Sequence, residues 1–230
     1  MILNTQTKEK SVPENNAFVK KTILCIIGLI IVALIALFYF RPLFIKAHLP
    51  KPVVINTENQ PTVGNPNAKI HIVAFEDLKC VNCARFNNEI MPYIKKQYID
   101  TGFAQYTMIN LAFVPGSLPA ANAAHCIYVQ NPALFFPFVE YLFQHQPPED
   151  QNWATIPTLM NFASQIPGVN TDQLADCLVK NPYDQIMRDN LTMASKLMGG
   201  SVSTPAIYIN GIKVTPVTKS QIDIVMEAVK

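Results

Sequence analysis

The sequence predicts an α/β domain with a helical insertion, preceded by one membrane-spanning helix. Three observations support this fold class. Residues 22–40 contain no charged residue and are long enough to span a membrane. A strand–helix–strand pattern follows at residues 69–111. After a helical stretch at residues 118–198, a strand–strand–helix pattern completes the chain.

The apolar segment at residues 22–40 is expected to be an uncleaved membrane anchor. As a helix, its 19 residues would extend about 28 Å at about 1.5 Å per residue, close to the hydrocarbon thickness of about 30 Å. A cleavable signal peptide has a shorter apolar core and small residues at its cleavage site, which residues 37–45 do not provide. A buried helix of a soluble domain would carry a polar face, and this segment has none.

The charges beside this segment predict its orientation. Four lysines precede it and three basic residues follow it, with Lys20 and Lys21 directly at its start. Under the positive-inside rule, residues 1–21 are expected to form a short cytoplasmic tail, with the rest of the chain on the other side. Residues 41–68 contain five prolines and are expected to form a stiff, extended Pro-rich spacer.

Composition limits the partners of the remaining chain. Half of the 230 residues are apolar, which is enough for one sizeable core with appendages. Residues 52–230 carry 11 Lys and Arg against 14 Asp and Glu, a net charge of −3, which argues against nucleic acid as a partner. Four of the five cysteines lie in this body, an even number that favours an oxidising compartment. The fifth, Cys25, is simplest to interpret as a small apolar residue of the anchor.

The domain at residues 69–230 is expected to begin with a βαβ unit. Residues 69–75 (KIHIVAF) have the apolar, β-branched composition of a buried strand. From Cys80, apolar residues recur at helical spacing until Thr101 and Gly102 end the helix. Residues 103–111 are again strand-like, so the two strands are expected to be parallel with a right-handed crossover.

Helical patterns then dominate an insertion at about residues 117–198. Prolines divide it into short predicted helices at residues 118–130, 133–145, 155–165, 171–180 and 183–198. Residues 206–210 and 212–214 read as a hairpin whose turn is formed by Asn210 and Gly211. Thr218 and Gln221 form a capping box for a last helix that ends at Val229.

Cys80 and Cys83 are expected on the first turn of the helix that follows the first strand. Free N–H groups and a partial positive charge at a helix N-terminus favour a thiolate. A second thiol nearby can resolve a mixed disulfide, so the pair suits thiol–disulfide exchange. Other uses fit less well: zinc needs a second ligand pair, c-type haem needs a histidine where Ala84 stands, and a disulfide closing so short a loop adds little stability.

Three blocks of sequence extend this interpretation: residues 64–68 (GNPNA), 75–86 (FEDLKCVNCARF) and 203–211 (STPAIYING). Together they resemble the DsbA-like thiol:disulfide oxidoreductases, which have a thioredoxin-like fold with an inserted all-helical subdomain. The resemblance implies that Cys80 is the exposed nucleophile and Cys83 the buried resolving thiol. It also implies that Pro205 is a cis-proline facing the disulfide, with the backbone of Thr204 available to pair with a client peptide.

The resemblance further implies the partners and the location. The expected substrates are unfolded or partly folded exported proteins, and a redox partner must recycle the cysteine pair. No dissociable cofactor and no metal are implied. The expected location is the bacterial inner (cytoplasmic) membrane, crossed once, with the catalytic domain on the periplasmic or extracytoplasmic side.

The two residues between the cysteines depart from the family pattern. Strong oxidants of the group carry Pro-His there, whereas Val81 and Asn82 offer no cation. Stabilisation of the thiolate would then come mainly from helix N–H groups, with Lys79 as a minor contributor. We therefore expect Cys80 to be less acidic and its disulfide less oxidising than in Pro-His members, which leaves oxidase and reductase or isomerase duty both open.

Other polar candidates have two interpretations each. Glu76 and Asp77 could relay a proton to the buried thiol, or could be solvated charges at a strand end. Cys126 and Cys177 could form a structural disulfide, or could be buried free thiols.

The histidines and aromatic residues are expected to pack rather than to react. This applies to His71, His125 and His145, and to the aromatic residues at positions 135–143. A minor alternative for the aromatic cluster is an apolar surface for unfolded clients.

Two other function classes stay open at this level. One is a thioredoxin-fold metallochaperone that binds copper through cysteines and a histidine. The other is a redox-inert binding scaffold that has kept the fold.

Overall fold

The computed structural model describes the backbone of residues 16–230, and the side chains of residues 19–36 and 49–230. The chain divides into two compact units, residues 1–48 and 49–230. Residues 1–15 of the predicted cytoplasmic tail lie outside the described residues.

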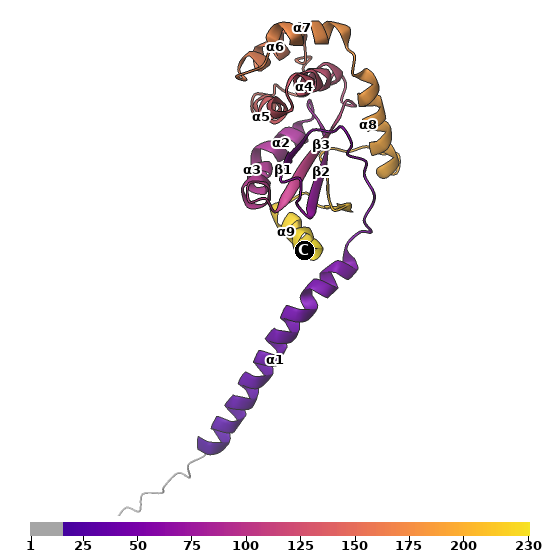
Figure 1. Cartoon of the computed structure of the whole chain (residues 1–230). Coiled ribbons are helices and arrows are strands. Elements are labelled where there is room, and N and C mark those ends of the chain that lie inside the picture. The colour runs from indigo at the N-terminus through magenta and orange to yellow at the C-terminus, as the bar shows by residue number, and fades with distance from the viewer. Residues whose placement is uncertain (1–15) are drawn as a thin grey trace, which may run out of the picture. The chain divides into compact units, whose positions relative to one another are not determined.

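The first unit contains one long helix, α1 (Asn16–His48) (Figure 1). Within it, Val19–Ala36 has a mean hydropathy of 2.4 and no buried residue, as length and composition require of a membrane span. The helix is longer than the predicted 22–40 and continues past Pro42. Proline removes one hydrogen bond of the helical ladder, and the backbone after it has resumed the helix. The predicted spacer therefore starts no earlier than Leu49.

The second unit is built on a mixed five-stranded sheet of order β1-β3-β2-β4-β5. The strands are β1 (Thr62–Gly64), β2 (Ile70–Asp77), β3 (Ala104–Leu111), β4 (Ala206–Ile209) and β5 (Ile212–Lys213). As predicted, β2 and β3 are parallel and β4 and β5 form an antiparallel hairpin. β4 also lies antiparallel to β2. This places the segment before β4 beside the carboxyl end of β2.

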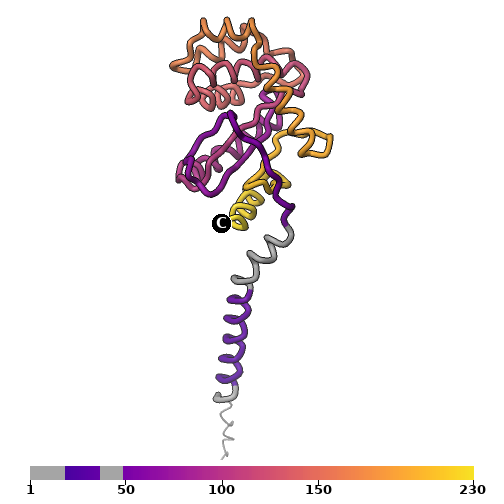
Figure 2. The backbone as a smooth tube through the Cα atoms, turned by 45° about the vertical axis from the view of Figure 1, so that its right-hand side comes forward, coloured from indigo at the N-terminus to yellow at the C-terminus, as the bar shows by residue number. Residues whose placement is uncertain are grey.

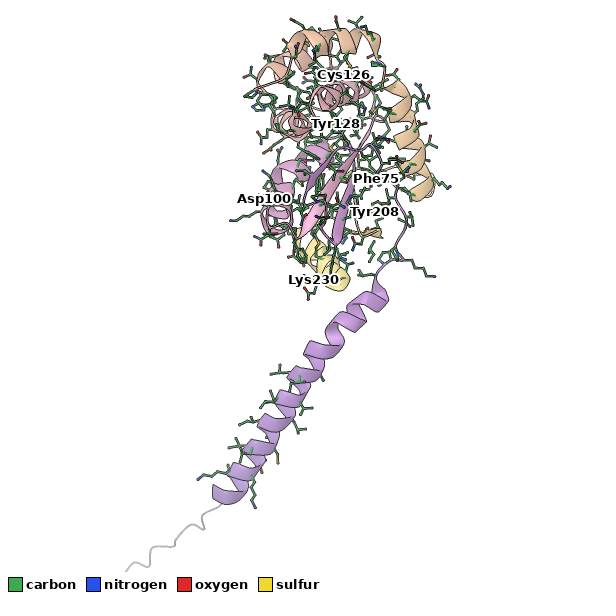
Figure 3. The ribbon with its side chains drawn as sticks, in the orientation of Figure 1. Phe75, Asp100, Cys126, Tyr128, Tyr208 and Lys230 are labelled. Carbon is green, nitrogen blue, oxygen red and sulfur yellow. A yellow bond between two sulfur atoms is a disulfide. The ribbon has the colours of Figure 1, made fainter. Side chains whose placement is uncertain are left out.

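Successive side chains of a strand point to opposite faces of the sheet. Apolar residues lie on both faces here, and helices cover both. On one face, Ile72 and Ala74 pack in the core shared with α2 (Val81–Glu89), α3 (Met91–Ile94) and α9 (Lys219–Val229). On the other, Phe75 and Tyr208 pack with Ala194 of α8 (Asp184–Leu197) (Figure 3). The predicted single helix after Cys80 is split, since Pro92 opens α3 and a π-helical turn (Lys95–Ile99) follows it.

The insertion forms a helical cap at one end of the sheet (Figure 1). It contains α4 (Leu118–Gln130), a 3₁₀ turn (Pro132–Leu134), α5 (Phe135–Gln144), α6 (Ile156–Ser164) and α7 (Thr171–Lys180), and it ends with α8, which packs on the sheet. The predicted helices are therefore confirmed to within two residues at each end. A disulfide between Cys126 of α4 and Cys177 of α7 joins two helices of the cap. Of the two interpretations of this pair, the structure has the bridge.

The Pro-rich segment after residue 48 is not a free spacer. Figure 2 shows it running along the domain. Val53 N donates a hydrogen bond to Gly211 O at 2.9 Å, and Pro61 O accepts one from Met108 N at 3.0 Å. Gly211 has φ +80°, and a Cβ there would lie 2.1 Å from Val53 O. Strand β1 then pairs antiparallel with β3. The expectation of a separate spacer is thus wrong for residues 53–64, because the backbones of Val53, Pro61 and β1 are hydrogen-bonded to the rest of the domain.

Candidate active site

Cys80 and Cys83 lie where the sheet meets the cap. Cys80 follows β2 and is the N-cap of α2, and Cys83 lies in the first turn of that helix. Both are free thiols. Cys80 exposes 6% of its surface and Cys83 exposes none. The predicted order of accessibility is correct, although Cys80 is more covered than an exposed nucleophile would be.

The free N–H groups at the start of α2 are all engaged. Cys80 N donates to Asp77 O at 3.1 Å, and Val81 N donates to the Glu149 carboxylate at 2.7 Å. The next two, those of Asn82 and Cys83, lower the pKa of the Cys80 thiol. The helix N-terminus therefore divides its donors between a sulfur and a carboxylate.

The loop before β4 forms the other side of the site. The Thr204–Pro205 peptide is cis, as expected from the resemblance, and a second cis peptide, Thr215–Pro216, was not predicted. The thiol of Cys80 donates to Thr204 O over 3.7 Å. The buried Thr204 hydroxyl has no hydrogen-bond partner of ordinary geometry among the described residues. It can therefore turn toward a thiolate on either cysteine.

These surroundings separate the acidities of the two thiols. The pKa of Cys80 is lowered to about 6, first by the hydrogen bond from the Cys83 thiol, then by the Thr204 hydroxyl and by the N–H groups of Cys83 and Asn82, against the effect of burial. The pKa of Cys83 is raised well above its ordinary value, mainly by burial. The expectation that helix N–H groups contribute most is therefore wrong, because the neighbouring thiol contributes more.

Lys79 does not assist the thiolate. Its ammonium donates to Pro115 O at 2.8 Å, and Lys79 is not among the groups that shift the pKa of Cys80. Only 5% of Lys79 is exposed, so the side chain is held in this position.

Glu76 and Asp77 have different surroundings. Glu76 is fully buried, accepts a hydrogen bond from Tyr106 Oη at 2.6 Å and another from Asn87, and burial raises its pKa to about 7. Asn87 also donates to Cys83 O at 3.0 Å, which links Glu76 to the buried cysteine. The expectation of a solvated charge at a strand end is therefore wrong for Glu76.

Asp77 is a structural anchor. Its carboxylate accepts hydrogen bonds from the N–H groups of Lys79, Phe113 and Val114 and from the Ser117 hydroxyl, at 2.8–3.0 Å. These contacts tie the loop after β2 to the loop before α4. All four donors are satisfied by Asp77, so the loop that carries Cys80 has a fixed position.

Comparison with known proteins gives the family. A family model described as Thioredoxin matches residues 56–228. Disulfide bond formation protein D of Bacillus subtilis is 31% identical over 154 residues, which cover 66% of this chain and 68% of that protein. The chain belongs to the DsbA-like thiol–disulfide oxidoreductases.

Solved structures agree with this assignment. The crystal structure of Chlamydia trachomatis DsbA has a TM-score of 0.70 and 29% identity, over 77% of this chain and 95% of that one. Oxidised BdbD from Bacillus subtilis has a TM-score of 0.71 and 28% identity, over 79% and 96% of the two chains. The oxidoreductase therefore has the thioredoxin-like fold with a helical insertion that its sequence predicts.

The structure brings together the four residues that the sequence singles out. Cys80 and Cys83 share one helical turn, and the carbonyl of Thr204, the residue before Pro205, accepts a hydrogen bond from the Cys80 thiol. Three further residues of the site were missed: Asn87 and Tyr106, which bind Glu76, and Glu149 of the insertion. Each free N–H group at the start of α2 needs an acceptor. This requirement predicts that some acceptor is present, but it does not identify Glu149.

The histidines are packed or hydrogen-bonded as predicted, although His145 is exposed. His71 Nε2 lies 2.7 Å from the Thr107 hydroxyl, and burial lowers the His71 pKa. His125 is buried with its ring centroid 4.4 Å from that of Tyr183, and His145 stacks on Tyr141. In the aromatic cluster, Phe135, Phe138 and Phe143 are buried in the core. Core packing therefore explains most of that cluster.

Proposed function

We propose that this oxidoreductase is a disulfide donor, whose Cys80–Cys83 disulfide oxidises thiol pairs in client proteins. The observation that carries the proposal is the contrast between the two thiols. The pKa of Cys80 is lowered to about 6 while that of Cys83 is raised. A stabilised thiolate favours the reduced form of the pair, which makes its disulfide more oxidising. Relatives named for disulfide bond formation support the same direction.

The exchange takes two steps that conserve atoms and electrons. A client thiolate attacks Cys80 Sγ, the bond to Cys83 breaks, and Cys83 leaves as a thiolate that takes up a proton. A second client thiolate then attacks the client sulfur of the mixed disulfide, and Cys80 leaves as a thiolate. The client loses two electrons and the cysteine pair gains them. Cys80 suits the first attack because it is the less buried of the pair, and the second departure because its thiolate is stabilised.

Glu76 supplies the proton that Cys83 takes up. Its pKa of about 7 keeps a large share of it protonated at neutral pH, and a negative charge on it would raise the pKa of Cys83. A cavity of about 670 Å³ is lined by Asn87 and Tyr106, the two partners of the Glu76 carboxylate. Solvent in this cavity gives Glu76 a route by which to recover its proton.

Thr204 and Pro205 position the client. Thr204 lies 3.7 Å from the Cys80 sulfur, so main-chain pairing of a client with this loop would bring a client thiol beside Cys80. Ser203 before it is exposed and Pro205 is half-buried, which leaves the loop edge accessible.

The helix α1 anchors the oxidoreductase in the bacterial inner membrane, with the catalytic domain on the extracytoplasmic side. The mean hydropathy of 2.4 over Val19–Ala36 supports the anchor, and the Cys126–Cys177 disulfide supports an oxidising compartment. Exported proteins would be the clients, and a separate redox partner would reoxidise Cys80 and Cys83.

Two measurements test the direction of exchange. Equilibration of the full chain with glutathione buffers is expected to give a reduction potential between about −120 mV, as in the strongest oxidants, and about −270 mV, as in a dedicated reductant. Acid quenching of cells followed by alkylation is expected to find the pair mostly oxidised. A mostly reduced pair would instead indicate a reductase or isomerase.

A further inference from the structure

Glu149 is a residue of the insertion that contacts the catalytic helix. It lies between α5 and α6, and its carboxylate accepts a 2.7 Å hydrogen bond from Val81 N, the N–H of the peptide bond that follows Cys80. Three residues earlier, Gln146 Nε2 donates to Leu78 O at 2.8 Å. Gln146 and Glu149 therefore bind Leu78 and Val81, the residues two before and one after Cys80. In each pair the two residues are 68 positions apart in sequence.

This contact matters because the donors at the start of α2 are few. Four N–H groups at the start of α2 lack a helical partner. That of Cys80 donates to Asp77 O, and those of Asn82 and Cys83 lower the pKa of the Cys80 thiol. Glu149 takes the remaining one. A carboxylate therefore shares with the thiolate the same patch of partial positive charge.

We propose that Glu149 is a positioning residue that destabilises the Cys80 thiolate and so makes the disulfide of this oxidoreductase less oxidising. It acts in two ways. It engages one of the few free N–H groups at the start of α2, and it places a negative charge 2.7 Å from the backbone nitrogen of the residue that follows Cys80. The inference rests on the proposed role of Cys80 as the reactive thiolate.

Other charged groups near Cys80 have positions that do not duplicate this role. Lys79 is directed to Pro115 O, Arg85 to the Asn82 side chain, and Asp77 is held by four donors. Glu76 interacts electrostatically with both thiols, but its carboxylate binds Tyr106 and Asn87 and not the N–H groups of α2. Asp150, next to Glu149, is exposed, and none of the described residues forms a hydrogen bond or ion pair with it. It serves as the matched control.

Thermodynamic linkage adds a second consequence. If the Glu149 charge disfavours the thiolate, the thiolate must weaken the Glu149 contact by the same factor. The loop at residues 146–149 is then held more tightly beside the disulfide or the neutral thiols than beside a thiolate. Hydrogen exchange of the Val81 amide should be slower in the oxidised protein than in the reduced protein at pH 8.

The test is a titration of the Cys80 thiolate by its ultraviolet absorbance in the full-length, detergent-solubilised chain. Glu149→Gln keeps an oxygen acceptor for Val81 N but removes the charge. Its thiol pKa is expected to fall by about half a unit, a threefold gain in acid dissociation, which corresponds to a potential more oxidising by about 15 mV. Glu149→Ala should lower it at least as far, since the N–H is also released. Asp150→Asn should change it by less than a third as much.

The outcomes separate this inference from the proposed function. If the wild type shows no low-pKa thiol that Cys80→Ser removes, the proposed role of Cys80 fails. If that thiol is present but Glu149→Gln leaves its pKa unchanged, raises it, or lowers it no more than Asp150→Asn does, the role of Glu149 is refuted. Equal exchange of the Val81 amide in oxidised and reduced wild type would refute the linkage in the same way.

Discussion

The two cysteine pairs of the body belong to the same apolar core but differ in spacing, in bonding and in the groups around their sulfurs. Cys80 and Cys83 stand two residues apart on one helical turn and are free thiols. Cys126 and Cys177 are 51 residues apart on two helices of the cap and are bonded. Cys126 is buried, and both pack in the same apolar core.

The difference lies in the donors around each sulfur. A thiol, a hydroxyl and two backbone N–H groups lower the pKa of Cys80. They stabilise its thiolate, and reduction of its disulfide is therefore more favourable. Cys126 and Cys177 lie in helices, whose backbone N–H groups beyond the first turn are already paired. One pair is therefore built to exchange, and the other to stay closed and hold the cap together.

Removing the sulfur of Cys80 should have the largest effect. Cys80→Ser is expected to reduce oxidation of a reduced two-cysteine peptide to the uncatalysed background. Cys83→Ser should instead accumulate a mixed disulfide through Cys80, visible by mass spectrometry. Cys25→Ser, in the exposed face of α1, is the control and should behave as wild type. Equal rates in Cys80→Ser and wild type would exclude the mechanism.

Opening the cap disulfide should affect stability and spare the chemistry. The Cys126→Ala, Cys177→Ala double variant is expected to lose about 4 kcal/mol of unfolding free energy, as a closed loop of this length implies in the chain-entropy model. Urea unfolding followed by the fluorescence of the single, buried Trp153 would measure the loss. The folded variant should exchange disulfides at the wild-type rate. A loss of exchange in the folded variant would show that the two pairs are not independent.

Local sequence patterns were sufficient for the elements and for the reactive pair. The apolar runs of β2 and β3, the capping box at Thr218 and the Cys80–Cys83 spacing each involve residues close in sequence. Such features depend on backbone geometry that repeats in all proteins, so they can be recognised without a fold. The order of strands and helices was predicted in the same way, but the position of the Thr204 loop near the cysteines was implied only by the family resemblance.

Long-range contacts were not predictable in the same way. Glu149 reaches Val81 across 68 positions, and Gln60 reaches Asn190 across 130. Nothing in the proline-rich composition of residues 49–64 indicates that their backbone is bonded to Gly211 and Met108. The burial of Glu76 was not predicted for a related reason. Its carboxylate binds Tyr106 and Asn87, which belong to other elements.

The buried Glu76 carboxyl should lower the free energy of unfolding at neutral and alkaline pH, whereas the cap disulfide raises this free energy. The pKa of Glu76 is about 7 in the folded state, above its ordinary value of 4.5, so the folded state binds the proton more tightly. Stability from this group is present at low pH and falls as the pH rises from 4.5 through 7, by up to about 3 kcal/mol.

Glu76→Gln should therefore be more stable than wild type at pH 8 and similar to it at pH 4. It should also slow client oxidation by about 10- to 100-fold, with the wild-type advantage shrinking above pH 7 as Glu76 loses its proton. Urea unfolding at both pH values and stopped-flow oxidation would measure these effects. A variant less stable than wild type at pH 8 would show that the carboxylate is not destabilising.

The smallest effect should come from a single hydroxyl. Thr204 has a buried hydroxyl with no other partner among the described residues, and this hydroxyl lowers the pKa of both reactive thiols. Thr204→Val keeps the shape of the side chain and removes the donor, so the pKa of Cys80 should rise by about half a unit, near the lower end of a net hydrogen-bond contribution. Thr204→Ser retains the donor and should restore most of the wild-type value. If Val and Ser change the pKa equally, then packing around the loop, not the hydroxyl, distinguishes this pair from the one in the cap.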